Sequence, residues 1–480
     1  MNPEVSCNSV GFVSLGCSKA LVDSELIITE LKASGYEIVP SYQDANLVVV
    51  NTCGFIDSAI EESISVICEA IDLTGRVIVT GCLGKKTMPD GESLILTRIP
   101  KVLGVVGPNS TQETVALVRK HLPLAKDKKL VLTKSLADGS TFSINQDSII
   151  PYHGLKLTPR HYAYLKISEG CNQKCSFCII PSMRGKLISR PIVEILNEAR
   201  SLVNSGVKEI IVISQDTGAY GADLRYKTEF FEGRPVKTSL IGLLFELKKL
   251  KVWIRLHYLY PYKFLDNIIP MMTVSSENKS SKWEQYSLLP YIDIPFQHAH
   301  PEILNKMRRP ANYENTLERI ASWREICPDL TIRSTFIVGF PGETNEHFSF
   351  LIDFLKVAKL DRVGCFIYSS VDGAAANTLP KPVDKNEQIE RKDIFMEVQK
   401  EISKSRLKRW LNREIFVLID SVDLESNCLI ARSTGDSPEI DGKVKVYAPP
   451  QSSPKVTIGE IAKVRITASD EYDLVGEYID

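Results

Sequence analysis

The chain has 480 residues, of which 44% are hydrophobic and 24% are charged, a balance that excludes a disordered protein and allows two or three packed domains. Its formal net charge is −1, so the chain as a whole carries no basic surplus that would indicate nucleic-acid binding. Residues 1–10 lack the charged start and apolar core of a signal peptide, and no apolar run approaches the ~20 residues that span a membrane. We therefore expect a cytoplasmic protein without a membrane partner, in which clustered cysteines bind metal rather than form disulfides.

Residues 8–125 are predicted to form an N-terminal α/β domain with a doubly wound parallel sheet. Short, nearly continuous apolar runs alternate with amphipathic stretches in this part of the chain. This pattern is typical of parallel strands that are covered by helices on both faces. The predicted strands are 10–15, 46–51 and 76–80, and the predicted helices are 23–34 and 56–71.

Each of the three predicted strands leads directly into a cysteine, which is Cys17, Cys53 or Cys82. Because the carboxyl ends of parallel strands lie along one edge of a sheet, these distant cysteines should meet there. Three converging thiolates can hold an iron–sulfur cluster with one open iron, and the alternative is that all three are inert turn residues. Cys68 falls inside a predicted helix instead, where we expect a buried, small apolar side chain.

The most specific motif of the chain is Cys171-x3-Cys175-x2-Cys178, which follows an apolar, strand-like run at 162–167. Three thiolates at this spacing can hold three corners of a cubane 4Fe–4S cluster and leave the fourth iron open for a small ligand. The alternative is a zinc knuckle, because Cys175-x2-Cys178 alone also fits zinc. No fourth ligand is obvious nearby, and the rest of the chain favours iron.

Residues 157–390 are predicted to form a second α/β domain around this motif. Six strand candidates are too few for a closed eight-stranded barrel and fit a partial (β/α)6 barrel that is open on one side. A polar stretch at 275–286 interrupts the pattern and is predicted to be a solvated insertion. The predicted strands are 162–168, 208–214, 252–258, 291–296, 331–339 and 361–368.

Polar side chains follow several of these strands, at the face where such barrels carry their active sites. Gln215 and Asp216 follow the second strand, His257 ends the third and His298 follows the fourth. These residues should therefore share one chamber with the cysteine motif. For Gln215, His257 and His298, ordinary hydrogen bonding at the barrel mouth is the alternative.

The tail is predicted to contain a charged linker helix at 391–412 and a small antiparallel β-barrel at 413–480. Residues 413–480 contain seven Lys or Arg and thirteen Asp or Glu, which gives a net charge of −6. RNA binding needs a basic surface, so RNA is disfavoured and a basic protein partner is favoured. The acidic residues gather in two loops, 436–441 and 470–473, and the alternative is that they only keep the surface soluble.

The order of these parts resembles the radical SAM methylthiotransferases, in which a three-cysteine domain precedes a radical S-adenosylmethionine (SAM) barrel and a TRAM-like tail. The likeness extends over essentially the whole chain. Several strings resemble the RimO-type branch, which modifies a ribosomal protein, rather than the MiaB branch, which modifies tRNA. These strings are SEGCN at 168–172, IIPSMRG at 179–185, SQDT at 214–217, DIPFQH at 293–298, RSTFIVGFPGET at 333–344 and PEIDG at 438–442.

The resemblance implies a reaction, a set of cofactors and two kinds of partner. RimO-type enzymes add a methylthio group to the β-carbon of an aspartate in small-subunit ribosomal protein twelve, which is a basic protein. Two 4Fe–4S clusters and SAM would supply this radical chemistry, with a flavodoxin- or ferredoxin-like electron donor. The cluster ligands would be Cys17, Cys53 and Cys82 for one cluster and Cys171, Cys175 and Cys178 for the other. The nearer alternative is a MiaB-like tRNA adenosine methylthiotransferase, and the farther one is a zinc-stabilised binding module without catalysis.

The resemblance also implies contacts to SAM outside the cluster. Phe177 stands between cluster cysteines, where the radical SAM fold places an apolar residue against adenine. Ile337 and Gly339 match the adenine contact of the fifth barrel strand. Gln215 and Asp216 stand where many members carry a Gly-Glu pair for the SAM amino group, and this departure leaves the role of Asp216 open.

Overall fold

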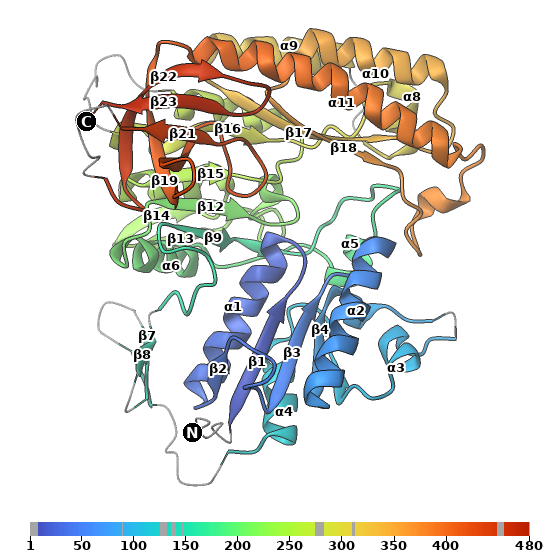
Figure 1. Ribbon diagram of the computed structural model, residues 1–480, viewed down its shortest axis with the longest axis vertical. Coiled ribbons are helices and arrows are strands. Elements are labelled where there is room, and N and C mark those ends of the chain that lie inside the picture. Colours follow the sequence, from blue (N-terminus) through green and yellow to red (C-terminus); the bar gives the residue numbers. More distant parts are fainter. Residues whose placement is uncertain are drawn as a thin grey trace.

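The computed structural model describes residues 8–88, 90–124, 132–135, 141–145, 148–150, 152–273, 283–309, 313–448 and 456–479. The N-terminal domain forms one lobe, and the second α/β domain and the tail barrel pack together as the other (Figure 1). Most of the insertion predicted at 275–286 lies outside the described residues, apart from a 3-10 turn at Trp283–Tyr286. No helix in the described ranges is both long enough and apolar enough to cross a membrane.

The N-terminal domain is a doubly wound α/β domain, as predicted. Its five strands are all parallel and lie in the order β2-β1-β3-β4-β5. On the central strand, Val48 and Val50 pack against the α2 side, whereas Leu47 and Val49 pack against α1 and α4. The strands are β1 (Ser9–Ser14), β2 (Glu37–Val39), β3 (Leu47–Thr52), β4 (Val77–Gly81) and β5 (Gly104–Val105), and the helices are α1 (Ser18–Ala33), α2 (Asp57–Thr74), α3 (Leu94–Arg98) and α4 (Thr111–His121).

The second domain is the predicted partial barrel. Its six strands are all parallel and lie in the order β18-β17-β16-β15-β12-β9, and the sheet stays open between β9 and β18. The strands are β9 (Tyr162–Lys166), β12 (Glu209–Ile213), β15 (Trp253–Leu256), β16 (Leu288–Asp293), β17 (Thr331–Val338) and β18 (Arg362–Ile367). The helices are α5 (Ile180–Arg184), α6 (Ile192–Asn204), α7 (Leu240–Leu247), α8 (Pro301–Lys306), α9 (Tyr313–Ile326), α10 (Asn345–Ala358) and α11 (Lys385–Leu407).

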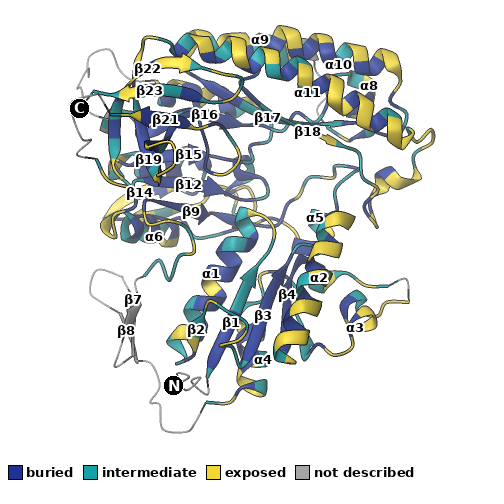
Figure 2. Ribbon diagram, in the orientation of Figure 1, coloured by how far each residue is buried: buried dark blue, intermediate teal, exposed yellow. Residues whose placement is uncertain are grey.

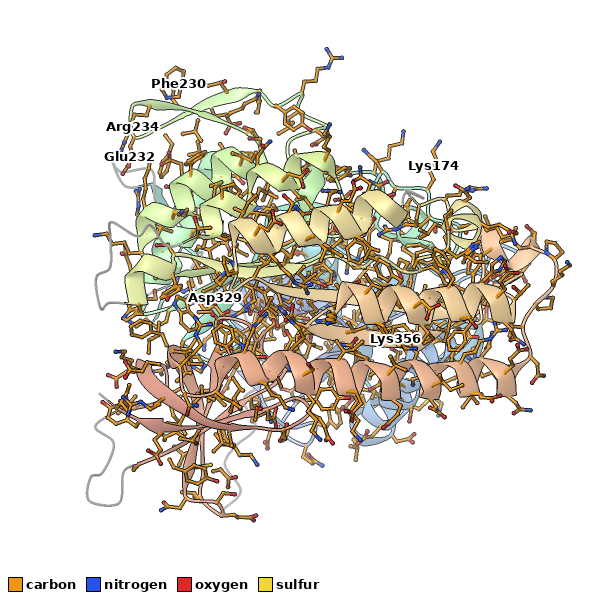
Figure 3. The ribbon with its side chains drawn as sticks, turned by 90° about the horizontal axis from the view of Figure 1, so that it is seen from above. Lys174, Phe230, Glu232, Arg234, Asp329 and Lys356 are labelled. Atoms are coloured by element: carbon orange, nitrogen blue, oxygen red, sulfur yellow. The ribbon has the colours of Figure 1, made fainter. Side chains whose placement is uncertain are left out.

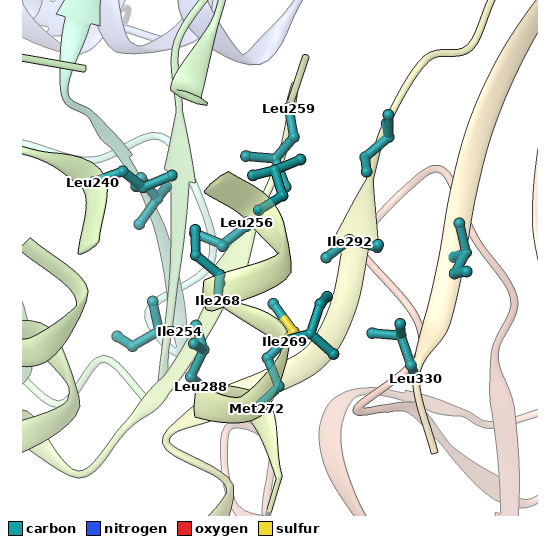
Figure 4. Close-up of a cluster of buried hydrophobic side chains, with 14 of the residues drawn as sticks. Leu240, Ile254, Leu256, Leu259, Ile268, Ile269, Met272, Leu288, Ile292 and Leu330 are labelled. Atoms are coloured by element: carbon teal, nitrogen blue, oxygen red, sulfur yellow. The ribbon is translucent and has the colours of Figure 1, made fainter. Parts of the chain in front are cut away.

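Alternate side chains of these strands point to opposite faces of the sheet, which separates the core from the barrel interior. Residues such as Ile254, Leu256 and Ile292 pack outward into the largest apolar cluster, under the helices (Figure 4). The strands are buried, while α9, α10 and α11 expose one side to solvent (Figure 2). The intervening residues, among them Arg255 and Tyr291, point into the barrel and are buried there.

The tail forms a closed five-stranded barrel, as predicted. Four of its strand pairs are antiparallel, and β21 and β23 run parallel to each other. The strands are β19 (Glu414–Asp423), β20 (Cys428–Ser433), β21 (Val444–Tyr447), β22 (Ile461–Ser469) and β23 (Leu474–Tyr478). Smaller elements are the β10 (Ser168–Glu169) and β11 (Ile188–Ser189) pair, the β13 (Thr228–Phe231) and β14 (Arg234–Lys237) hairpin, and the β6 (Leu132–Ser135), β7 (Thr141–Asn145) and β8 (Ser148–Ile150) sheet.

Two of the three acidic side chains in loop 436–441 are buried rather than free at the surface, which corrects the sequence-based interpretation of that loop. Asp436 pairs with Arg362 of β18, and an Asp441 oxygen lies 3.3 Å from Arg333 of β17. Both aspartate side chains are only 2% exposed. These carboxylates neutralise arginines of the barrel interior and thereby dock the tail barrel onto the second domain. The other acidic loop, 470–473, remains at the surface.

Candidate active site

The three N-terminal cysteines come together at the carboxyl edge of the first sheet, as the parallel topology predicts. A Cβ atom added to Gly16 would lie 3.3 Å from the Cβ of Cys53. Burial raises the pKa of the Cys82 thiol, and the nearby Cys17 and Cys53 thiols add to that rise. At Cys17, desolvation would raise the thiol pKa, but the Lys19 ammonium, the backbone N–H groups of Ala20 and Lys19 and the Arg184 guanidinium together outweigh it and lower that pKa. All three cysteines are free.

The second cysteine group occupies the loop between β10 and α5. The backbone N–H of Gln173 donates to Cys171 Sγ (3.4 Å), and that of Ile180 donates to Cys178 Sγ (3.5 Å). Burial raises the pKa of Cys171 to about 11 and that of Cys178 to about 12. Such thiols remain protonated at neutral pH unless a metal takes the place of the proton.

The spacing of the sulfur atoms distinguishes a zinc ion from an iron–sulfur cluster. Two thiolates on one zinc ion, each at about 2.3 Å from the metal, lie no more than about 4.6 Å apart. Among the described residues, neither cysteine group brings three sulfur atoms within 4.8 Å of one another. Neither group has the spacing of a preformed single-ion site, and their all-thiol donor sets fit an iron–sulfur cluster.

Two buried oxygen atoms without a donor lie beside the second cysteine group. They are Gln215 Oε1 and Asp216 Oδ1, which have no hydrogen-bond partner in the described part of the chain. The other carboxylate oxygen of Asp216 accepts hydrogen bonds from Gln173 Nε2 (2.9 Å) and from the Tyr262 hydroxyl (2.6 Å). Burial raises the pKa of Asp216. Orphaned buried acceptors of this kind fit a cationic donor such as the ammonium group of SAM, the expected cofactor.

Two of the three residues expected to contact adenine lie together, and the third faces a helix. Phe177 and Ile337 pack against the same small apolar cluster at the open side of the barrel. Gly339 has a φ of +70°, and a Cβ atom there would lie 2.3 Å from Gln388 Cγ. Glycine at position 339 is therefore explained by its backbone conformation and by its contact with α11.

A buried charge network joins the two cysteine groups across the domain interface. The Arg184 guanidinium donates to Cys82 Sγ (3.4 Å) through Nε and lies 3.0 Å from both Asp23 and Glu169. Lys166 contacts the same two carboxylates. Sequence reasoning did not identify this network. The only signal was Arg184 itself, within the string IIPSMRG.

The histidines at the barrel mouth make ordinary hydrogen bonds, which is the alternative to a role in the active site. His257 Nε2 lies 2.8 Å from the Ser437 hydroxyl, and His298 Nδ1 accepts from a backbone N–H at 3.0 Å.

A third group of metal-ligand residues, outside the chamber, consists of His300, Glu302 and His347. Both Nδ1 atoms accept backbone N–H bonds, so each neutral ring carries its proton on Nε2 and offers no lone pair there. His347 Nε2 faces Glu302 at 3.3 Å, so the group is a hydrogen-bonded cluster.

Comparison with known proteins places these parts in one enzyme class. Residues 9–107 match the uncharacterized protein family UPF0004, residues 165–355 match the radical SAM superfamily and residues 413–479 match the TRAM domain. The structure resembles the radical SAM methyltransferase TsrM from Kitasatospora setae, at a TM-score of 0.50 and 14% identity over 76% of this chain and 77% of that one. This likeness concerns the fold alone. Together with the cysteine groups, these matches define a radical SAM enzyme of the methylthiotransferase type.

The chain belongs to the RimO family. It is 53% identical to the ribosomal protein uS12 methylthiotransferase RimO of Pectobacterium atrosepticum over 470 residues, which is 98% of both chains. The RimO of Aeromonas salmonicida is 54% identical over 465 residues, or 97% of both chains. Membership confirms the predicted RimO-type branch over the MiaB-like alternative, and it implies one 4Fe–4S cluster and SAM.

Proposed function

We propose that this enzyme adds a methylthio group to the β-carbon of an aspartate in ribosomal protein uS12. One observation supports this more than any other. Two separate three-cysteine groups lie on two domains, and the side chain of Arg184 contacts Cys82 of one group and Glu169, two residues before Cys171 of the other. A radical SAM enzyme without sulfur insertion would need only one of these groups. Relatives at 52–54% identity carry the name of this activity.

Each cysteine group would hold its own 4Fe–4S cluster, with Cys171, Cys175 and Cys178 on the SAM side and Cys17, Cys53 and Cys82 on the sulfur side. When bound, the two clusters would supply a radical from SAM and a transferable sulfur. A radical is needed because the unactivated C–H bond of the aspartate has no practical acid–base route at neutral pH. The protein binds and orients the reactants. Gln215 and Asp216 accept from the SAM ammonium, and Phe177 and Ile337 pack against adenine. The third predicted adenine contact, Gly339, faces α11 in this structure.

Arg184 fixes the separation of the two groups. Its side chain is 2% exposed and contacts Asp23 of α1 as well as Glu169, two residues before Cys171. The reacting atoms of two bound partners must approach within about 3–3.5 Å, so a rigid link between the two sites favours transfer. We further propose that the enzyme acts in the cytoplasm and receives electrons from a flavodoxin- or ferredoxin-like protein.

The test is mass spectrometry of uS12 after incubation with SAM, a reductant and the anaerobically reconstituted enzyme. We expect the mass of one methylthio group on a single aspartate. Cys53→Ala should stop this modification while SAM cleavage continues, and Cys175→Ala should stop both. Cys68→Ala is the matched control, because Cys68 is an exposed cysteine of the same domain. Modified tRNA with unmodified uS12, or full product from Cys53→Ala, would overturn the proposal.

A further inference from the structure

In the described part of the chain, one cation near the sulfur-side cysteines has no carboxylate partner. Lys19 lies in the first turn of α1, two residues after Cys17. Its Nζ atom lies 3.2 Å from the centroid of the Tyr258 ring, which belongs to the second domain. Among the described residues no carboxylate pairs with this ammonium.

The neighbouring cations are already neutralised. Lys166 and Arg184 share the two carboxylates of Asp23 and Glu169, so this network contains two positive and two negative charges. Lys19 adds a positive charge that no carboxylate in the described ranges balances. A partly buried charge of this kind is more stable once an anion pairs with it.

The residue beneath Lys19 is held in a strained conformation. Tyr258 has a φ of +58°, which is rare for a bulky side chain and is found mainly where function requires it. Its backbone is fixed by hydrogen bonds from its N–H to Asp293 Oδ2 (3.1 Å) and from the Thr217 N–H to its carbonyl (3.0 Å). Its hydroxyl lies 3.3 Å from the Ser18 Oγ. Tyr258 thus links the Lys19 ammonium to the second domain, where its carbonyl accepts from the residue next to Asp216.

We propose that Lys19 binds the side-chain carboxylate of the substrate aspartate and so determines the choice of aspartate over its neutral analogue. The inference rests on the proposed function and names the residue that recognises its substrate. The β-carbon is bonded directly to that carboxylate, so a salt bridge to Lys19 would hold it beside the sulfur-side cysteines. Cys17 is exposed and Cys53 is partly exposed, so this edge of the first sheet can be reached from solvent.

The test compares two synthetic peptides copied from uS12 around the modified residue, identical except that one carries Asp and the other Asn. Their dissociation constants are measured for the cluster-loaded wild type, Lys19→Met and Lys19→Arg. Lys174→Met is the matched control, because Lys174 also neighbours a cluster cysteine but projects from the surface (Figure 3). Iron content and SAM cleavage without peptide are recorded for every variant.

We expect the wild type and Lys174→Met to prefer the Asp peptide by about 10- to 100-fold, as for one charge-assisted hydrogen bond. In Lys19→Met this preference should fall to about one, with weaker binding of the Asp peptide only, and Lys19→Arg should retain most of it. An unchanged preference in Lys19→Met would overturn the inference. Loss of iron from Lys19→Met would also overturn it, because Lys19 would then support binding of the cluster rather than of the substrate. If the wild type binds neither peptide and leaves uS12 unmodified, the proposed function fails and this inference fails with it.

Discussion

Replacing Glu169 by Gln tests whether the buried network stabilises the junction between the two cysteine groups. The Glu169 carboxylate lies 2.9 Å from Lys166 Nζ and 3.0 Å from Arg184 Nη1, and it accepts a third bond from Gln215 Nε2 (2.5 Å). Burial alone would raise its pKa, but Lys166 and Arg184 lower it from 4.5 to about 2. At about 1.4 kcal/mol per pKa unit, this difference corresponds to about 3 kcal/mol of folding free energy.

The sign of the pH dependence follows from the direction of the shift. Because the folded-state pKa is lowered, the stabilisation from Glu169 is fully present above about pH 4.5 and is lost as the pH falls towards about 2. Glu169→Gln should therefore lower the free energy of unfolding by about 3 kcal/mol at pH 7. The free energy of unfolding of this variant should also lack the decrease that Glu169 causes between about pH 4.5 and about pH 2.

The measurement is urea unfolding of the second domain, followed by the fluorescence of the buried Trp253 and Trp323. Glu232→Gln is the matched control, because Glu232 pairs with Arg200 at the surface and is 49% exposed. Such a pair contributes about 0–1 kcal/mol. Equal losses in Glu169→Gln and Glu232→Gln would refute the assigned stabilisation.

Two further substitutions test the fold around the site. Gly339→Ala should lower the free energy of unfolding by about 2 kcal/mol or more, because position 339 has a left-handed backbone and the new Cβ would clash with Gln388 of α11. The control Gly364→Ala should change it by less than about 0.5 kcal/mol in the same assay, because the nearest atom to its new Cβ would lie 3.7 Å away, at an ordinary contact distance. Arg432→Met should weaken docking of the tail barrel by about 3 kcal/mol, because it removes one of the two arginines that neutralise the buried Glu209 carboxylate. Limited proteolysis should release the tail of Arg432→Met at a lower protease concentration than the tail of the control Arg465→Met, in which only an exposed ion pair is broken. Equal release from the two variants would contradict the docking role of Arg432.

The sequence predicts the parts of this molecule that depend on local pattern and topology. Apolar runs that end in Cys17, Cys53 and Cys82 indicated parallel strands, and parallel strands place their carboxyl ends at one edge. The convergence of these cysteines therefore follows without any three-dimensional information. The six strands of the partial barrel follow from the same alternation of apolar runs and helices.

Contacts between domains do not follow from local pattern. Counting charges could not show that Asp436 and Asp441 are buried against arginines of the barrel, because those arginines lie more than seventy residues away in the sequence. Asp23 belonged to a predicted helix, and nothing local pairs it with Arg184. Cys68 was expected to be buried, but it is exposed because Ile67 and Ala70 take the inward face of α2.

The iron and acid-labile sulfide content of anaerobically purified protein tests the assignment of two clusters most directly. Wild type would be measured beside two triple alanine variants, one at Cys171, Cys175 and Cys178 and the other at Cys17, Cys53 and Cys82. We expect about eight iron atoms per chain in the wild type and about four in each variant, as for two independent cubane clusters. About four iron atoms in the wild type and none without Cys171, Cys175 and Cys178 would contradict it. The sulfur-side cysteines would then hold no cluster, and sulfur insertion would have to be withdrawn.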